Sequence, residues 1–142
     1  MAVKILLVDD EEEFTNSLAQ RLETRGFDVH TAYNGDDALT RVRDHEVDVV
    51  ILDVLMPGKS GVETLREIKQ LKPITEVIML TGQATVDTAI EGMKLGAYDY
   101  LMKPTEINDL VEKITKATAR KTEHEERIRD AHINTIVKRR GW

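Results

Sequence analysis

Short apolar runs alternate along the chain with longer stretches whose apolar residues recur at helical spacing. The apolar runs are rich in β-branched residues and predict strands over 3–8, 27–32, 47–52, 77–80 and 97–101. The stretches between them predict helices over 11–25, 34–43, 60–71 and 85–95, and a final helix beginning at Pro104 and Thr105. In the first helix, for example, Phe14, Leu18 and Leu22 repeat every four residues and predict a buried face.

Two of the predicted strands differ in how they should be covered. Residues 27–32 alternate apolar and polar side chains, which is typical of an edge strand, whereas 47–52 is continuously apolar and predicts a central strand covered on both faces. Strands that alternate with helices predict right-handed crossovers and a parallel sheet. We therefore expect an α/β fold, an open doubly wound sheet of about five strands with helices on both faces.

Polar side chains mark the starts of the predicted helices. Asp10, with Glu13 three residues later, is expected to cap the first helix, and Asn34 opens the second. Ser60 and Glu63 have the spacing of a capping box at the start of the third.

Composition narrows the class of protein. Hydrophobic residues make up 41% of the chain and charged residues 32%, cysteine is absent, and no apolar run approaches the roughly 20 residues of a membrane span. We therefore expect a cytoplasmic chain without disulfides or a membrane partner. The net charge of −6 argues against direct DNA binding, and the triplet Lys138, Arg139 and Arg140 is interpreted as a solvated terminus.

Candidate chemistry gathers where the predicted strands end. Asp9 and Asp10 follow the first strand, Asp53 the third, Thr81 the fourth and Lys103 the fifth. Ligands of open parallel sheets bind beyond the carboxyl ends of the strands, so these side chains should share one rim. Each residue alone is a weak signal, because acidic residues favour helix starts and Lys is usually exposed. Their joint occurrence at successive strand ends is what favours a site.

The chemistry expected at this rim is phosphoryl transfer to a carboxylate. Three crowded carboxylates suit Mg²⁺, which binds through one or two carboxylates and keeps room for phosphate oxygens, while Lys103 adds a positive charge for a phosphate. Asp53 follows the most hydrophobic strand and is the predicted nucleophile. Asp9 and Asp10 would then hold the metal.

With these positions placed, the chain resembles the response-regulator receiver family from Val3 to about Ala119. The resemblance rests on four segments in order, Val8-Asp9-Asp10, residues 52–61 (LDVLMPGKSG), Leu80-Thr81-Gly82 and residues 96–104 (GAYDYLMKP). It implies a flavodoxin-like fold with strand order 2-1-3-4-5. It also implies a response regulator of two-component signalling that takes a phosphoryl group from a sensor histidine kinase or phosphotransfer protein onto Asp53.

The same resemblance implies roles for the other residues of the rim. Asp10 would ligate Mg²⁺ directly and Asp9 mainly through water, with Asp53 and the backbone carbonyl of Leu55 completing the protein ligands. Lys103 would pair with Asp53 and then with a phosphoryl oxygen, and the Lys103-Pro104 bond is expected to be cis. On this interpretation the chain is a signalling module that catalyses only its own phosphorylation and dephosphorylation.

A conformational switch is also implied by the resemblance. Thr81 would move its hydroxyl onto a phosphoryl oxygen, Tyr100 would rotate inward, and the surface of the fourth helix, fifth strand and fifth helix would change its affinity for a downstream protein or a second copy. Without the resemblance, Tyr100 would be interpreted as an ordinary half-buried aromatic.

The chain is expected to divide into a receiver domain, 1–119, and a C-terminal segment, 120–142. The segment has no Pro and no Gly before Gly141, and its apolar residues do not form clean heptads. Three interpretations remain, a helical extension that pairs weakly with another chain, a short helix folded back, or the start of a linker to an output domain. We favour the helical extension.

Three other functions fit the sequence less well than that of a receiver. A Mg²⁺-dependent phosphohydrolase with an Asp nucleophile would want a second Asp two residues later, where Leu55 stands. A transcription factor using the basic tail conflicts with the acidic balance of the chain. A degenerate receiver conflicts with the presence of every key residue.

Leu55 and Gln83 depart from the commonest polar choices of the family and should flank the path of the attacking water. We predict slow self-dephosphorylation, because an apolar Leu55 cannot orient that water. Leu55→Asn should therefore shorten the lifetime of the phosphorylated protein, measured by the decay of the intact mass. An unchanged decay rate would contradict this role.

Overall fold

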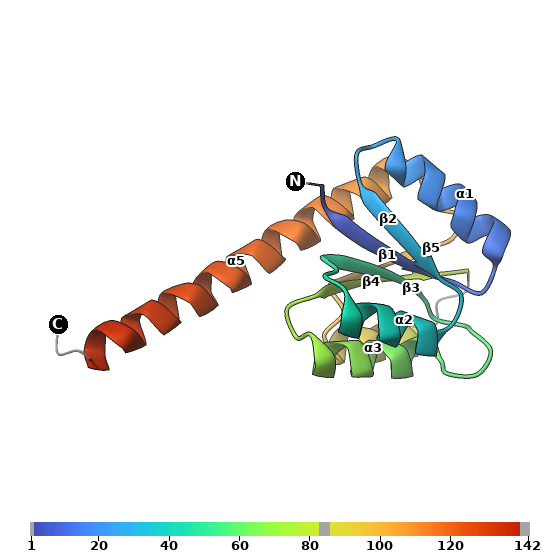
Figure 1. Cartoon of the computed structure of the whole chain (residues 1–142). Helices are drawn as coiled ribbons and strands as arrows, with labels where there is room; N and C mark the ends of the chain where they lie inside the picture. Colours follow the sequence, from blue (N-terminus) through green and yellow to red (C-terminus); the bar gives the residue numbers. More distant parts are fainter. Residues whose placement is uncertain (1, 83–85, 140–142) are drawn as a thin grey trace.

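A five-stranded, all-parallel sheet forms the centre of the computed structural model (Figure 1), which describes residues 2–82 and 86–139. The strands are β1 (Lys4–Val8), β2 (Asp28–Ala32), β3 (Val49–Asp53), β4 (Glu76–Thr81) and β5 (Asp99–Met102). Their order is β2-β1-β3-β4-β5, and every neighbouring pair is parallel. The predicted fold class and strand order are confirmed.

Five helices cover the sheet in the described part of the chain. They are α1 (Glu12–Glu23), α2 (Gly35–Asp44), α3 (Gly61–Leu71), α4 (Val86–Lys94) and α5 (Ile107–Arg139). Buried residues of α1 and α5 pack into one cluster, and those of α2 and α3 pack into the other, so the two pairs lie on opposite faces. In α4, Gly92 approaches the side chain of Met79, which places α4 on the face of α2 and α3.

The two central strands are buried along their whole length. Every residue of β3 and β4 is buried, with Val50 and Leu52 of β3 in one core cluster and Val49 and Ile51 in the other. A strand covered on both faces needs apolar side chains at every position, which explains the continuous apolar run. The edge strand β2 alternates exposed and less exposed residues, as its alternating sequence predicted.

The predicted caps are correct at two helices and wrong at one. Asn34 accepts a hydrogen bond from the Asp37 N–H, and Ser60 from the Glu63 N–H, at 2.8 and 3.2 Å. Asp10 does not cap α1. The N-cap is Glu11, whose side chain makes no capping bond, and the Glu11 backbone N–H donates to the Asp9 carboxylate at 3.0 Å. Asp10 is left exposed beside the carboxyl ends of the strands.

At the opposite, amino-terminal end of the sheet, α5 is held in place by an ion pair with a buried carboxylate. Glu76 at the start of β4 is 1% exposed and accepts from the Arg120 guanidinium, with Lys69 at 3.5 Å. The Arg120 guanidinium also lies 4.6 Å from the centre of the Tyr98 ring. A buried carboxylate is tolerated only with such partners, so the two helices that supply them, α3 and α5, are fixed against β4.

The next residue of α5 makes a second ionic contact. The Lys121 ammonium is buried and lies 3.1 Å from Asp48, just before β3, and 3.0 Å from Glu125 on its own helix.

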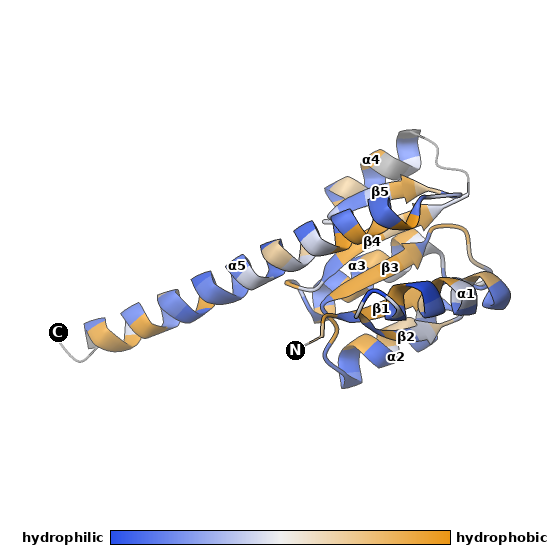
Figure 2. Ribbon diagram, turned by 90° about the horizontal axis from the view of Figure 1, so that it is seen from above, coloured by the Kyte–Doolittle hydropathy of each residue, from blue (hydrophilic) through white to orange (hydrophobic). Residues whose placement is uncertain are grey.

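Beyond this point α5 leaves the sheet and continues to Arg139 as a projecting helix, largely hydrophilic in Figure 2. Its large apolar residues Ile128, Ile133 and Ile136 are exposed. Among the described residues, no helix is both long and apolar enough to span a membrane.

Candidate functional site

The parallel register brings the carboxyl ends of four strands to one rim. β1 is followed by Asp9 and Asp10, β3 ends in Asp53, β4 ends in Thr81, and Lys103 follows β5. Asp53 lies across from Leu80 in the β3–β4 ladder, and the Lys103 N–H donates to the Thr81 carbonyl at 2.6 Å. Residues from separate parts of the sequence therefore meet because the parallel register brings the carboxyl ends of these strands to the same level.

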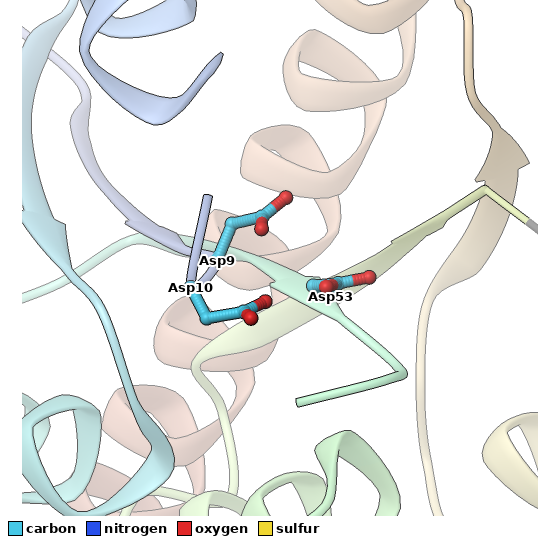
Figure 3. Close-up of side chains that lie close together, drawn as sticks. All are labelled: Asp9, Asp10 and Asp53. Carbon is cyan, nitrogen blue, oxygen red and sulfur yellow. The ribbon is translucent and has the colours of Figure 1, made fainter. Parts of the chain in front are cut away.

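Three carboxylates form the centre of this rim (Figure 3). Asp9, Asp10 and Asp53 each offer an oxygen, and these atoms all lie within 4.8 Å of one another. Asp9 and Asp53 are buried, at 4% and 5% exposure, whereas Asp10 is exposed. Crowded carboxylates repel one another, and a hard divalent cation with oxygen ligands relieves that repulsion. The donor set fits such a cation.

Lys103 neutralises part of this charge. Its ammonium lies 2.5 Å from Asp9, 3.6 Å from Glu11 and 4.0 Å from Asp53, so its hydrogen bond is to Asp9 and its ion pair with Asp53 is looser. Burial lowers the pKa of Lys103, but the Asp9 hydrogen bond and the charges of Asp53, Asp9 and Glu11 outweigh it, and the net pKa is raised. Lys103 is therefore protonated and positively charged at neutral pH. The Lys103-Pro104 peptide is cis, as predicted.

Asp53 has an unusual proton affinity. Burial, and then the negative charge of Asp9, raise the pKa of its carboxyl to about 6, against the opposing effects of Lys103 and the Leu55 N–H. A carboxylate that is both buried and repelled by its neighbours is a poorly stabilised anion. Such groups gather at functional sites, where a bound cation or a transferred group can relieve the repulsion.

The loops on either side of Asp53 and Asp9 are held by short-range contacts. The Thr15 hydroxyl is buried against the carbonyls of Asp9 and Glu11, at 3.3 and 2.8 Å. Gly61, at the start of α3, lies directly against the backbone of Asp53, where an added Cβ would clash. A glycine is required there by this close approach, and it lets α3 begin immediately beside the site.

Comparison with known proteins decides what this arrangement is. Residues 5–115 match the family model described as the response regulator receiver domain. The chain belongs to this family. The predicted family is thereby confirmed, and with it the assignment of the chain as a receiver domain of two-component signalling. The transcriptional regulatory protein ZraR of Salmonella typhimurium is 41% identical over 117 residues, which cover 82% of this chain and 26% of that protein.

Solved receiver structures share the fold. The receiver domain protein (CheY-like) from Methanospirillum hungatei has a TM-score of 0.84 at 29% identity, covering 87% of this chain and 99% of that one. A response regulator from Burkholderia pseudomallei, solved with a phosphorylated aspartic acid, a calcium ion and citrate, has a TM-score of 0.76 at 27% identity, covering 98% and 86%. This receiver chain spans about a quarter of the length of ZraR.

Three of the remaining predicted site residues of the receiver lie in the described part of the chain. The Thr81 side chain is buried at the end of β4, 1% exposed. Tyr100 is 40% exposed on β5, and Leu55 is 65% exposed two residues after Asp53. The predicted lifetime residue Gln83 lies outside the described residues.

Two neighbours of Lys103 escaped the sequence analysis of the site. In the sequence Glu11 is simply an acidic residue at the start of the first predicted helix, and Phe14 belongs to the apolar face of that helix. In the structure Glu11 forms an ion pair with Lys103, and the Phe14 ring lies 4.4 Å from its ammonium. No signal in the sequence separates these roles from the ordinary ones, because Lys103 is about 90 positions away.

The raised pKa of Asp53 predicts how the receiver's stability depends on pH. Because the folded-state pKa of about 6 exceeds the unfolded value near 3.8, the folded state binds the proton more tightly. Stability should therefore fall as pH rises from about 4 to about 6. Asp53→Asn should remove this fall and, in EDTA at pH 7, raise the free energy of unfolding by on the order of 2 kcal/mol.

Urea unfolding at several pH values measures this effect. Asp130→Asn, which changes an exposed carboxylate on the projecting part of α5, is the matched control and should leave the pH dependence intact. A wild-type protein and an Asp53→Asn variant with the same pH dependence would contradict the account of Asp53.

Proposed function

We propose that this receiver domain accepts a phosphoryl group on Asp53, in a reaction that needs a divalent cation and is catalysed by the domain itself. The observation that carries the proposal is the convergence of three carboxylate oxygens within 4.8 Å, two of them from buried side chains, with Lys103 beside them. Phosphoryl transfer demands mainly charge neutralisation and positioning, which these groups supply.

Asp53 is assigned as the nucleophile because of its surroundings. It ends the fully buried strand β3, and the N–H of Leu55 donates to its carboxylate. Burial removes water from the Asp53 carboxylate and the negative charge of Asp9 repels it, and both effects make its anion reactive. Its pKa of about 6 leaves the carboxyl mostly ionised at neutral pH. Asp9 and Asp10 lie in the loop just after β1, whereas Asp53 is itself the last residue of β3.

Mg²⁺ is the proposed cation. Asp9, Asp10 and Asp53 would hold it, with the Leu55 carbonyl as a further ligand, because hard oxygen donors and room for water are what Mg²⁺ requires. When bound, the cation would neutralise the charge that develops on the transferred group. A calcium ion accompanies the phosphorylated aspartic acid in the Burkholderia pseudomallei relative, which supports a divalent ion at this position.

The chain's own residues would complete the reaction. Lys103 would leave its contact with Asp9 or share it, and hold a phosphoryl oxygen above Asp53. Thr81, at the adjacent strand end, would donate its hydroxyl to another oxygen. The exposed Leu55 gives the attacking water no polar partner, so together with Gln83 it would set a long lifetime.

Signal output is proposed at the surface made by α4, β5 and α5. Ile90 and Met93 of α4 and Tyr100 and Met102 of β5 are large apolar side chains, each at least 40% exposed. Clustered exposed apolar residues on neighbouring elements favour a protein partner. Movement of Thr81 towards the phosphoryl group would make room for Tyr100 to turn inward and so change this surface.

The phosphoryl donor is proposed to be a sensor histidine kinase or a phosphotransfer protein in the cytoplasm. Residues 1–119 would form the receiver, and 120–142 a helical extension leading to a partner or a further segment. The description of ZraR as a transcriptional regulator belongs to a protein of which the matched residues cover only 26%, and the acidic charge of this chain gives no support for DNA binding by these residues alone.

Labelling with acetyl phosphate tests the proposal. Wild-type protein incubated with acetyl phosphate and Mg²⁺ should gain the mass of one phosphoryl group, and EDTA should prevent the gain. Asp53→Asn should remain unlabelled, because it lacks the carboxylate that we assign as the nucleophile, while Asp130→Asn should label normally. Labelling of Asp53→Asn at the wild-type rate would overturn the assignment.

A further inference from the structure

An aromatic ring lies against the only cation of the carboxylate rim among the described residues. The Lys103 ammonium lies 4.4 Å from the centre of the Phe14 ring, well inside the roughly 6 Å over which a cation is attracted to an aromatic face. Phe14 belongs to α1 and Lys103 to the loop after β5, so this contact joins two elements on either side of Asp53.

Lys103 needs such a contact because its carboxylate partners compete for it. Its ammonium is 2.5 Å from Asp9 and 4.0 Å from Asp53, the two buried acids, but also 3.6 Å from Glu11, whose side chain is 67% exposed. A lysine side chain has a flexible four-carbon stem and no fixed donor geometry. Charge alone therefore leaves the ammonium free to shift between the buried pair and the exposed Glu11.

The Phe14 ring belongs to the wall of the site as well as to the core. It packs against the core cluster of α1 and α5, and it lines a small cavity, with room for about one water, together with Asp9, Thr15 and Asp53. Packed core side chains therefore hold the Phe14 ring on one side, and its other side borders the cavity that Asp9 and Asp53 also line. A ring held in this position restricts the positions that the Lys103 ammonium can occupy.

We infer that Phe14 is a positioning residue for phosphoryl transfer, which acts by holding the Lys103 ammonium over the buried carboxylates Asp9 and Asp53. The role of Lys103 on the phosphoryl group rests on the proposed function, whereas the contact between Phe14 and Lys103 does not. In this role Phe14 would contact neither the phosphoryl group nor the divalent metal ion. Its effect passes entirely through Lys103.

The competing explanation is that Phe14 only fills the core. The chain offers a matched control, because its other phenylalanine, Phe27, packs against the same core cluster and contacts no cation among the described residues. Leucine keeps most of the apolar volume at either position and removes the aromatic face. Core filling predicts similar consequences for Phe14→Leu and Phe27→Leu, whereas positioning predicts that only Phe14→Leu changes Lys103.

Nuclear magnetic resonance of the full chain tests the contact directly. The side-chain ε protons of Lys103 should carry an upfield ring-current shift in the wild type, measured in EDTA and again with Mg²⁺. Phe14→Leu should abolish this shift, Phe14→Tyr should keep it, and Phe27→Leu should leave it unchanged. A Lys103 resonance that does not respond to Phe14→Leu would overturn the inference.

Single-turnover phosphorylation by acetyl phosphate and Mg²⁺ tests the consequence. Phe14→Leu should lower the maximal rate about 3- to 10-fold, as expected for loss of a partly exposed cation–π contact, with little change in the half-saturating acetyl phosphate concentration. Phe14→Tyr should recover the rate to within about twofold. In a Lys103→Met background, Phe14→Leu should have less than about a twofold further effect, because the residue it acts through is gone.

The outcomes separate this inference from the proposed function. Equal rate losses for Phe14→Leu in the wild-type and Lys103→Met backgrounds would leave Phe14 a core residue and the phosphorylation of Asp53 intact. A wild-type protein that takes up no phosphoryl group would overturn the proposed function. The ring-current shift of Lys103 would in that case still decide whether Phe14 holds the ammonium.

Discussion

The repulsion among three carboxylates at the end of the sheet is the constraint on which the rest of this structure depends. Asp9 and Asp53 are buried and Asp10 lies beside them, with oxygens from all three within 4.8 Å. A folded protein tolerates such crowding only when cations and fixed donors oppose it. Lys103 and the Leu55 N–H do so in part, and the remaining imbalance is visible in the raised pKa of Asp53. Binding of a divalent cation at this site, or protonation of Asp53, should therefore stabilise the fold.

The two ends of the sheet carry opposite kinds of ionic contact. At the carboxyl end the acids outnumber the bases and the charge is left partly unbalanced. At the amino end Glu76 is matched by Arg120 and Lys69, and Asp48 by Lys121, so the two buried charges there, on Glu76 and Lys121, are both paired. The helix α5 connects the two ends, since it begins a few residues after Lys103 and passes Arg120 and Lys121 before it projects from the sheet. Its buried residues Leu110 and Ile114 also share a core cluster with Leu80 of β4, next to Thr81.

The sequence predicted the sheet, its edge strand and the rim because these follow from periodicity and from where strands end. The continuous apolar runs of β3 and β4 and the alternation of β2 each report how a strand is covered, and that cover is a local property of the pattern. The cap of α1 was predicted wrongly because the prediction chose Asp10, whereas the N-cap is Glu11 and the Asp9 carboxylate accepts the Glu11 N–H. Phe14 and Glu11 were missed for a different reason, since their partner Lys103 meets them only through the fold.

The most direct test of the central claim is to locate the phosphoryl group in the sequence. Borohydride reduces an acyl phosphate to an alcohol, so a phosphorylated aspartate becomes homoserine at its own position. Wild-type protein treated with acetyl phosphate and Mg²⁺, reduced with borohydride and mapped by peptide mass spectrometry should contain homoserine at position 53 alone. Homoserine at position 9 or 10, or a phosphoryl group on a histidine or serine with an unmodified Asp53, would contradict the account.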